Sequence, residues 1–136
     1  MDAGGEVVAA GVAFTVVKLS GPSGARLWRR AVSGIAISST AFAVTVDAGG
    51  DVVAAGATTT GGFSDFTVAK LSGPSGARLW RRVINGPGNA NDEAFAVAVD
   101  AGGDVVAAGS INNTGTGEDF AVVKLRGADG GDFRPR

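Results

Sequence analysis

Short stretches in which large and small apolar residues alternate occur along the whole chain and predict β-strands. Residues 42–46 read Phe-Ala-Val-Thr-Val and residues 95–99 read Phe-Ala-Val-Ala-Val, so Phe and two Val are expected on one face and Ala or Thr on the other. Residues 52–55, Val-Val-Ala-Ala, form a short apolar run, as in a strand buried on both faces. No segment keeps the i, i+3, i+4, i+7 spacing of an amphipathic helix beyond one turn. The pattern therefore predicts an all-β fold.

The same unit is repeated along the chain. A decapeptide that begins at Asp2 recurs at Asp47 and at Asp100, and the last two copies are identical. Residues 18–30, KLSGPSGARLWRR, return unchanged at residues 70–82, and a third, diverged version begins at Lys124. A period of about 45 to 53 residues is typical of propeller blades and of helical repeats. The strand pattern excludes the helical repeats.

Each unit holds up to four expected strands, which we name types A to D in chain order. In the middle unit they are residues 41–46, 51–56, 65–71 and 77–83. Residues 47–50, Asp-Ala-Gly-Gly, and 72–76, Ser-Gly-Pro-Ser-Gly, have the composition of tight turns between A and B and between C and D. Four short antiparallel strands per unit, buried on both faces, predict a β-propeller blade.

We expect one repeat array over residues 1–136, divided into three units. Residues 1–40 hold strands B, C and D, residues 41–93 hold A to D, and residues 94–136 hold A, B and C with a degenerate tail. This inventory gives ten strands, and Phe133 and Arg134 are a candidate eleventh. The chain thus supplies about two and a half blades, whereas closed propellers typically have 4 to 8.

An unclosed array would expose the apolar faces and edges of its end blades. We therefore expect copies of the chain to close a ring together, with missing A and D strands supplied across the junction as in domain swapping. Two chains would make about five or six blades and three would make about eight. The sequence thus predicts a homo-oligomer, with a dimer favoured over a trimer.

Composition narrows the function further. Twenty-three glycines among 136 residues fall mostly at the expected turns. The chain has no Cys and no His, which excludes disulfides, thiol nucleophiles and histidine acid–base chemistry. Twelve basic and 13 acidic residues give a net charge of −1, so no nucleic-acid partner is expected. No apolar run is long enough to span a membrane, and we expect no membrane partner, no cofactor and no metal.

The units resemble the bacterial β-propeller repeat called SBBP. The matching positions are residues 65–71, Gly76, Trp80, Gly86, Asp92, residues 94–100 and residues 103–109. The first unit departs from the pattern, because it lacks the loop that residues 57–65 form in the second. The resemblance implies a bacterial secreted or cell-surface protein, although no basic-then-apolar signal segment follows Met1. Residues 76–80, Gly-Ala-Arg-Leu-Trp, are also similar to the tryptophan-docking element of quinoprotein propellers.

Two repeated polar features have structural interpretations. Asp47 with Asp51, and Asp100 with Asp104, flank glycine turns, where they could bind Ca²⁺ but lack the further oxygen ligands of an EF-hand loop. We interpret them as turn caps.

Trp28 and Trp80, each followed by two arginines, could form a nucleic-acid platform. At net charge −1 we give them a structural interpretation instead. The arginines discourage edge-to-edge pairing of the outermost strand, and their stems can cover the tryptophan rings. The lysines at positions 18, 70 and 124 are expected to anchor polar contacts or to face solvent.

The B–C loops and D–A connections, which share one rim of a propeller, differ between the units. Loops on a rigid scaffold often carry function, and the candidate ligand-binding residues there are Thr59, Phe63, Asn89, Asn112 and Asn113. The leading hypothesis is a non-enzymatic structural or interaction module that self-assembles into a ring. The alternative is a carbohydrate- or peptide-binding propeller that holds a polar ligand, such as a glycan, on this rim. We expect no catalytic residues, because near-identical units favour structure over the asymmetric groupings of an active site.

Overall fold

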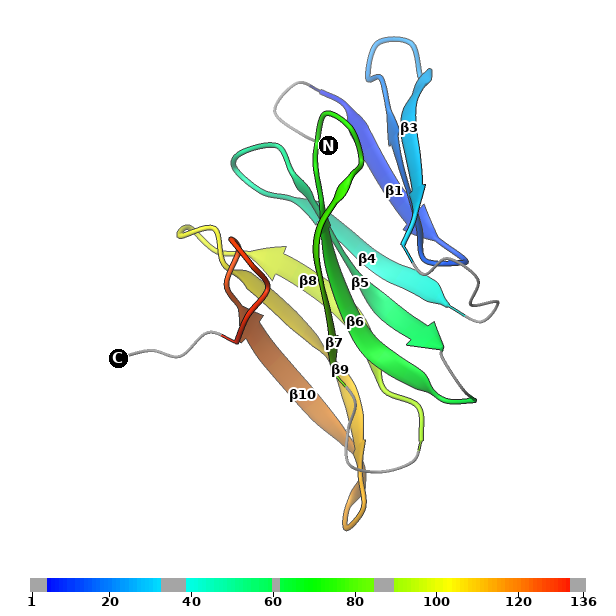
Figure 1. Cartoon of the computed structure of the whole chain (residues 1–136), viewed down its shortest axis with the longest axis vertical. Helices are drawn as coiled ribbons and strands as arrows, with labels where there is room; N and C mark the ends of the chain where they lie inside the picture. Colours follow the sequence, from blue (N-terminus) through cyan, green and yellow to red (C-terminus); the bar gives the residue numbers. More distant parts are fainter. Residues whose placement is uncertain (1–4, 33–38, 60–61, 85–89, 133–136) are drawn as a thin grey trace.

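In the computed structural model, the described part of the chain folds into ten antiparallel strands in three sheets (Figure 1). The structure describes residues 5–32, 39–59, 62–84 and 90–132. The first sheet contains β1 (Val7–Gly11), β2 (Thr15–Leu19) and β3 (Arg26–Ala31). The second contains β4 (Thr40–Val46), β5 (Val52–Thr59), β6 (Ser64–Leu71) and β7 (Arg78–Ile84), and the third contains β8 (Glu93–Val99), β9 (Val105–Asn113) and β10 (Gly117–Leu125). Among these residues no helix is long and apolar enough to cross a membrane.

The all-β prediction and its inventory of ten strands are confirmed. The first sheet has strand types B, C and D, the second has A to D, and the third has A, B and C. The candidate eleventh strand at residues 133–134 lies outside the described residues. Strand β5 continues beyond its expected end at Gly56, because Thr59 still pairs with Ser64 of β6.

The expected placement of the A-strand phenylalanines is wrong. Phe42 was expected to share a face with the two following valines, but the register shifts between Ala41 and Ala43. This β-bulge puts Ala41 on the packed face with the valines and leaves Phe42 half exposed. Phe95 occupies the same bulge in β8, and the two rings lie 5.4 Å apart at an interplanar angle of 43°.

The second sheet packs between the other two, and its inner strands β5 and β6 are therefore buried on both sides (Figure 1). The side chains that pack toward the first sheet are those of Val52, Ala54, Ala69 and Leu71. Those that pack toward the third sheet are the alternating Val53, Ala55, Phe66 and Val68. The period-2 alternation of a strand thus divides one apolar segment between two cores.

Candidate interaction site

A tryptophan on the last strand of the second sheet binds the C–D turn of the third sheet. Trp80 Nε1 donates a hydrogen bond of 2.9 Å to the carbonyl oxygen of Gly127, and Lys70 Nζ donates to the same oxygen at 3.1 Å. Asp104 Oδ1 accepts from the Gly127 amide at 3.0 Å, which fixes the turn against its own sheet. The carbonyl oxygen of Gly127 therefore accepts hydrogen bonds from both the indole and the ammonium group of the neighbouring sheet.

The junction between the first and second sheets repeats this arrangement. Trp28 Nε1 and Lys18 Nζ donate to the carbonyl oxygen of Gly73 at 2.7 and 3.0 Å. The indole lies on Gly76, where an added Cβ would come within 2.6 Å of ring atoms of Trp28. We call this arrangement the indole dock: a C–D turn whose two glycines accept the tryptophan of the preceding sheet.

The first sheet carries an indole dock that no described residue covers. Its C–D turn has the same glycines, Gly21 and Gly24, and both are exposed. Gly24 has φ +71°, close to the +75° of Gly76, but an added Cβ on Gly24 would meet no atom within 4 Å. The turn therefore has the backbone of an indole dock, and no described tryptophan lies on it.

The outer side of the third sheet is an apolar surface, which we call the C-face: Val106, Ala108, Phe120 and Val122. Phe120 corresponds in the repeat to Phe66, and Val122 corresponds to Val68. Phe120 and Val122 are 79% and 57% exposed, whereas both counterparts are fully buried against the third sheet. Contiguous exposed apolar surfaces often belong to interaction sites, so the C-face is a candidate site.

The outer side of the first sheet forms a second surface, which we call the N-face: Val7, Ala9, Val17 and Leu19. Val7 is 41% exposed, whereas its counterparts Val52 and Val105 are 0% and 1% exposed. In the two inner junctions, this set of positions packs against the equivalents of the C-face. The two outer faces are thus the two halves of a junction that the chain forms twice internally.

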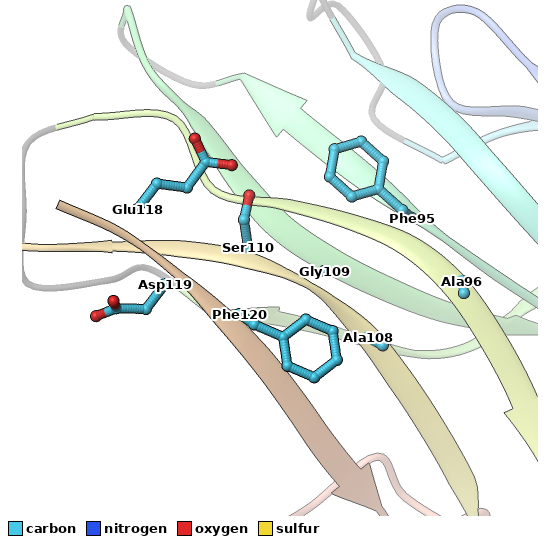
Figure 2. A pocket seen from close by; sticks show the side chains of 8 residues that line it. All are labelled: Phe95, Ala96, Ala108, Gly109, Ser110, Glu118, Asp119 and Phe120. Atoms are coloured by element: carbon cyan, nitrogen blue, oxygen red, sulfur yellow. The ribbon is translucent and has the colours of Figure 1, made fainter.

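A hollow of about 540 Å³ lies on the third sheet (Figure 2). Figure 2 shows Phe95 of β8 and Phe120 of β10 on either side of β9, which contributes Ala108. Glu118 and Asp119 border the hollow as well. Strand β8 of the third sheet packs against β5 and β6 of the second sheet. The hollow therefore corresponds to a surface that the A-type strand of a following sheet covers.

The repeated aspartates cap their turns, as expected. Asp47 Oδ1 accepts hydrogen bonds from the amides of Gly49 and Asp51, and its other oxygen pairs with Lys70 Nζ at 2.9 Å. Burial raises the pKa of Asp47, but Lys70 and these amides lower it more, so the pKa lies below its ordinary value. Within the described residues, no group of three His, Cys, Asp or Glu side chains could hold a metal ion.

Asp100 repeats the turn cap in the third sheet. Its Oδ1 accepts from the amides of Gly102 and Asp104, and its other oxygen pairs with Lys124 Nζ at 3.0 Å. Lys124 and the amides lower the pKa of Asp100 as well. The carboxylates of both turns therefore cap their own A–B turn and pair with a lysine of the same sheet.

The candidate rim residues lie on separate hairpins. Thr59 and the half-exposed Phe63 belong to the β5–β6 hairpin, whereas Asn112 and Asn113 end β9. Asn89 lies outside the described residues.

Both of these asparagine side chains form contacts within the protein. Asn112 Nδ2 donates to the carbonyl of Asn91, and Asn113 Nδ2 donates to Asp119. The Thr116 hydroxyl also donates to Asp119, and these two bonds hold the pKa of that carboxylate below its usual value. Asn112 lines a polar hollow of about 310 Å³ with Asn91, Glu93, Ser110 and Glu118.

Phe120, Val122 and the turn at residues 20–25 were not among the candidate residues predicted from the sequence. The repeat itself could have identified them, because they occupy the same repeat positions as Phe66, Val68 and residues 72–77 of the second unit, where buried contacts are expected. Local sequence reports only the apolar character of these residues. Whether a neighbouring sheet covers them depends on their place in the array.

The chain is similar in fold to solved quinohemoprotein alcohol dehydrogenases. It matches the enzyme of Comamonas testosteroni with a TM-score of 0.71 and 12% identity, and ADHIIG of Pseudomonas putida HK5 with a TM-score of 0.70 and 13% identity. Each match covers 96% of this chain but only 25% of the longer protein. These structures are β-propellers, so the likeness confirms the predicted fold class. No protein-family model and no curated protein matches the chain, and the SBBP resemblance remains a prediction.

Proposed function

We propose that this chain is a non-enzymatic structural module that joins copies of itself, head to tail, into a closed propeller ring. The observation that carries the proposal is the contrast between Phe120, which is 79% exposed, and Phe66, which is fully buried. The two residues occupy the same repeat position, and a following sheet covers only Phe66. A second copy would provide the missing cover.

The inner junctions are the template for this contact. The surface that covers Phe14 and Val16 of the first sheet includes Val52, Ala54, Ala69 and Leu71. The N-face has the same residues at three of these four positions, with Val17 in place of Ala69. The N-face therefore repeats the surface that covers Phe14 and Val16 at the inner junction, and Phe14 and Val16 are the repeat counterparts of Phe120 and Val122 on the C-face.

The two faces differ from each other, so the contact is heterologous, and it closes into a ring only if the rotation returns to its start. Two copies supply six sheets, which is within the usual range of 4 to 8 blades. A trimer would reach the upper end of this range, at about eight blades, so a dimer is favoured. The third unit has Arg134 at the repeat position of Trp80, so the contact between copies lacks one indole.

A structural role also accounts for the charged groups. The turn carboxylates of Asp47 and Asp100 pair with lysines and cap turns. The solved structures of similar fold are alcohol dehydrogenases, but this chain spans a quarter of their length at 12–13% identity. The carbohydrate- or peptide-binding alternative has less support, because the amides of Asn112 and Asn113 already donate hydrogen bonds within the protein.

Sedimentation equilibrium of the Phe120→Glu variant tests the proposal. The unaltered chain is expected to associate, and the charge on the C-face should return it to the mass of one chain. Phe63→Glu is the matched control, because Phe63 is also exposed, at 49%, but lies outside both faces. The proposal fails if the unaltered chain is a folded monomer, or if Phe120→Glu and Phe63→Glu associate equally well.

A further inference from the structure

Strand β1 has an open edge at which the other two sheets carry an additional strand. The first sheet has the order β1-β2-β3, so among the described strands β1 pairs with β2 alone. Its repeat counterparts β5 and β9 pair on both sides, with the A-type strands β4 and β8 along the second edge. An open edge presents unpaired backbone groups and is a template for a further strand.

A glycine marks the place where the A-type strand approaches. At Gly56 an added Cβ would overlap the carbonyl oxygen of Thr40, and at Gly109 it would overlap that of Glu93. Both carbonyls belong to the A-type strand of the same sheet, next to its bulge. The absence of a side chain at these two positions thus lets the A-type strand lie close to its partner.

Gly11 occupies the same repeat position at the end of β1. An added Cβ there would meet no atom within 4 Å, and Gly11 is not among the residues with positive φ. Neither crowding nor backbone conformation therefore requires a glycine in the described chain. The first sheet thus has the glycine that makes room for an A-type strand, but no described strand lies against it.

A strand at this edge would also cover the neighbouring molecule. Within the chain β8 pairs with β9 and at the same time packs against β4, β5 and β6 of the preceding sheet. The hollow beside Phe120 lies on the corresponding surface of the third sheet. In a head-to-tail pair of copies, one added strand would fill both the β1 edge and this hollow.

We propose that the β1 edge accepts an extended A-type strand from a further repeat unit on another molecule, by β-augmentation. The inference deepens the proposed self-assembly and rests on it for the second surface of the donated strand. Both A-type strands of the described chain, β4 and β8, already pair within their own sheets, so the donor is an additional strand. The backbone provides affinity, and alternate side chains provide specificity.

The inner A-type strands define what the donor must look like. Ala94 is fully buried and Ala41 is 3% exposed, so the position before the bulge must be small. Val97 and Val99 pack against the preceding sheet. The donor is therefore a segment of the pattern Ala-Phe-Ala-Val-x-Val.

A fluorescent peptide with the sequence of residues 92–100, Asp-Glu-Ala-Phe-Ala-Val-Ala-Val-Asp, is the probe. Its binding is measured by fluorescence anisotropy with dilute chain, and hydrogen exchange shows which strand it protects. We expect saturable binding and slower exchange of β1 amides. Gly11→Ala should weaken binding by about tenfold or more, because the new Cβ occupies the place of the donor carbonyl. A peptide with Val97→Pro is the matched control, since it lacks one N–H donor and should not bind.

The stability of the variant separates a blocked edge from a damaged fold. Gly11→Ala should unfold at the same temperature as the unaltered chain, and Gly11→Val provides a second, larger block at the same place. The inference is overturned if the peptide does not bind, if it binds both glycine variants as well as the unaltered chain, or if it protects the C-face but not β1 and this protection disappears in Phe120→Glu. The chain could stay monomeric and still bind the peptide in a way that depends on Gly11. That outcome would support the strand site and contradict only the proposed self-assembly.

Discussion

The second and third sheets present nearly the same apolar residues to very different surroundings. Phe66 and Val68 lie in a core between two sheets, whereas Phe120 and Val122 lie at the surface. The strands that carry them are close repeats, Phe-Thr-Val-Ala-Lys-Leu and Phe-Ala-Val-Val-Lys-Leu. The difference shows that each sheet forms by its own pairing, while its burial depends on the sheet that follows. This comparison can be tested by making the same substitution in both places.

The largest contrast is expected from removing the aromatic ring. Phe66→Ala should lower the free energy of unfolding by about 3–5 kcal/mol, because it leaves a cavity in a packed core. Phe120→Ala should change the stability of the single chain by no more than about 0.5 kcal/mol, as is usual for surface positions. Urea denaturation of dilute protein measures both values. Equal losses in the two variants would mean that the C-face is buried in the folded monomer.

A smaller contrast is expected between the covered and the open indole dock. Gly76→Ala and Gly24→Ala both force alanine into a left-handed conformation, at about 1–2 kcal/mol each. Gly76→Ala also pushes against Trp28, and overpacking of this kind adds about 1–3 kcal/mol. Thermal unfolding should therefore show the larger loss for Gly76→Ala. If Gly24→Ala is as destabilising in dilute protein, the first turn already has a partner within the chain.

The smallest contrast is expected from the turn aspartates. Because the pKa of Asp47 and of Asp100 is lowered by folding, each carboxylate stabilises the fold above its ordinary pKa, about 3.9. That stability is lost as the pH falls through the lower folded pKa, since the unfolded chain then binds more protons. Asp47→Asn should weaken this acid dependence more than Asp100→Asn, because the Asp47 side chain is 10% exposed and that of Asp100 is 34% exposed.

Urea denaturation at several pH values from about 6 down to about 2 checks this order. The unaltered chain should lose stability mainly below about pH 4. A steeper effect of Asp100→Asn than of Asp47→Asn would show that shelter by the neighbouring sheet does not strengthen the ion pair.

Strand positions and turns were predictable because they depend on local patterns. Period-2 alternation located the A strands, and repeated Asp-Ala-Gly-Gly segments located the A–B turns that Asp47 and Asp100 cap. The bulge at Phe42 was not predictable from alternation, because it depends on how β4 pairs with β5 across from Gly56. Exposed apolar faces on the end blades were predicted from the open array, but only the pairing of β10 with β9 showed that Phe120 and Val122 lie on such a face.

The sequence by itself determined the repeat, the strand types and the turn chemistry, because neighbours in the chain decide backbone conformation and hydrogen-bond caps. Only the tertiary structure decided which side chains of a strand face a neighbouring sheet, as at the bulge beside Ala41, and where one strand crowds a glycine of the next. Gly56 and Gly109 lie under an A-type strand, whereas Gly11 has open space in front of it. Three glycines in the same local sequence differ in this way because β5 and β9 pair with an A-type strand of their own sheet, whereas no described strand pairs with that edge of β1.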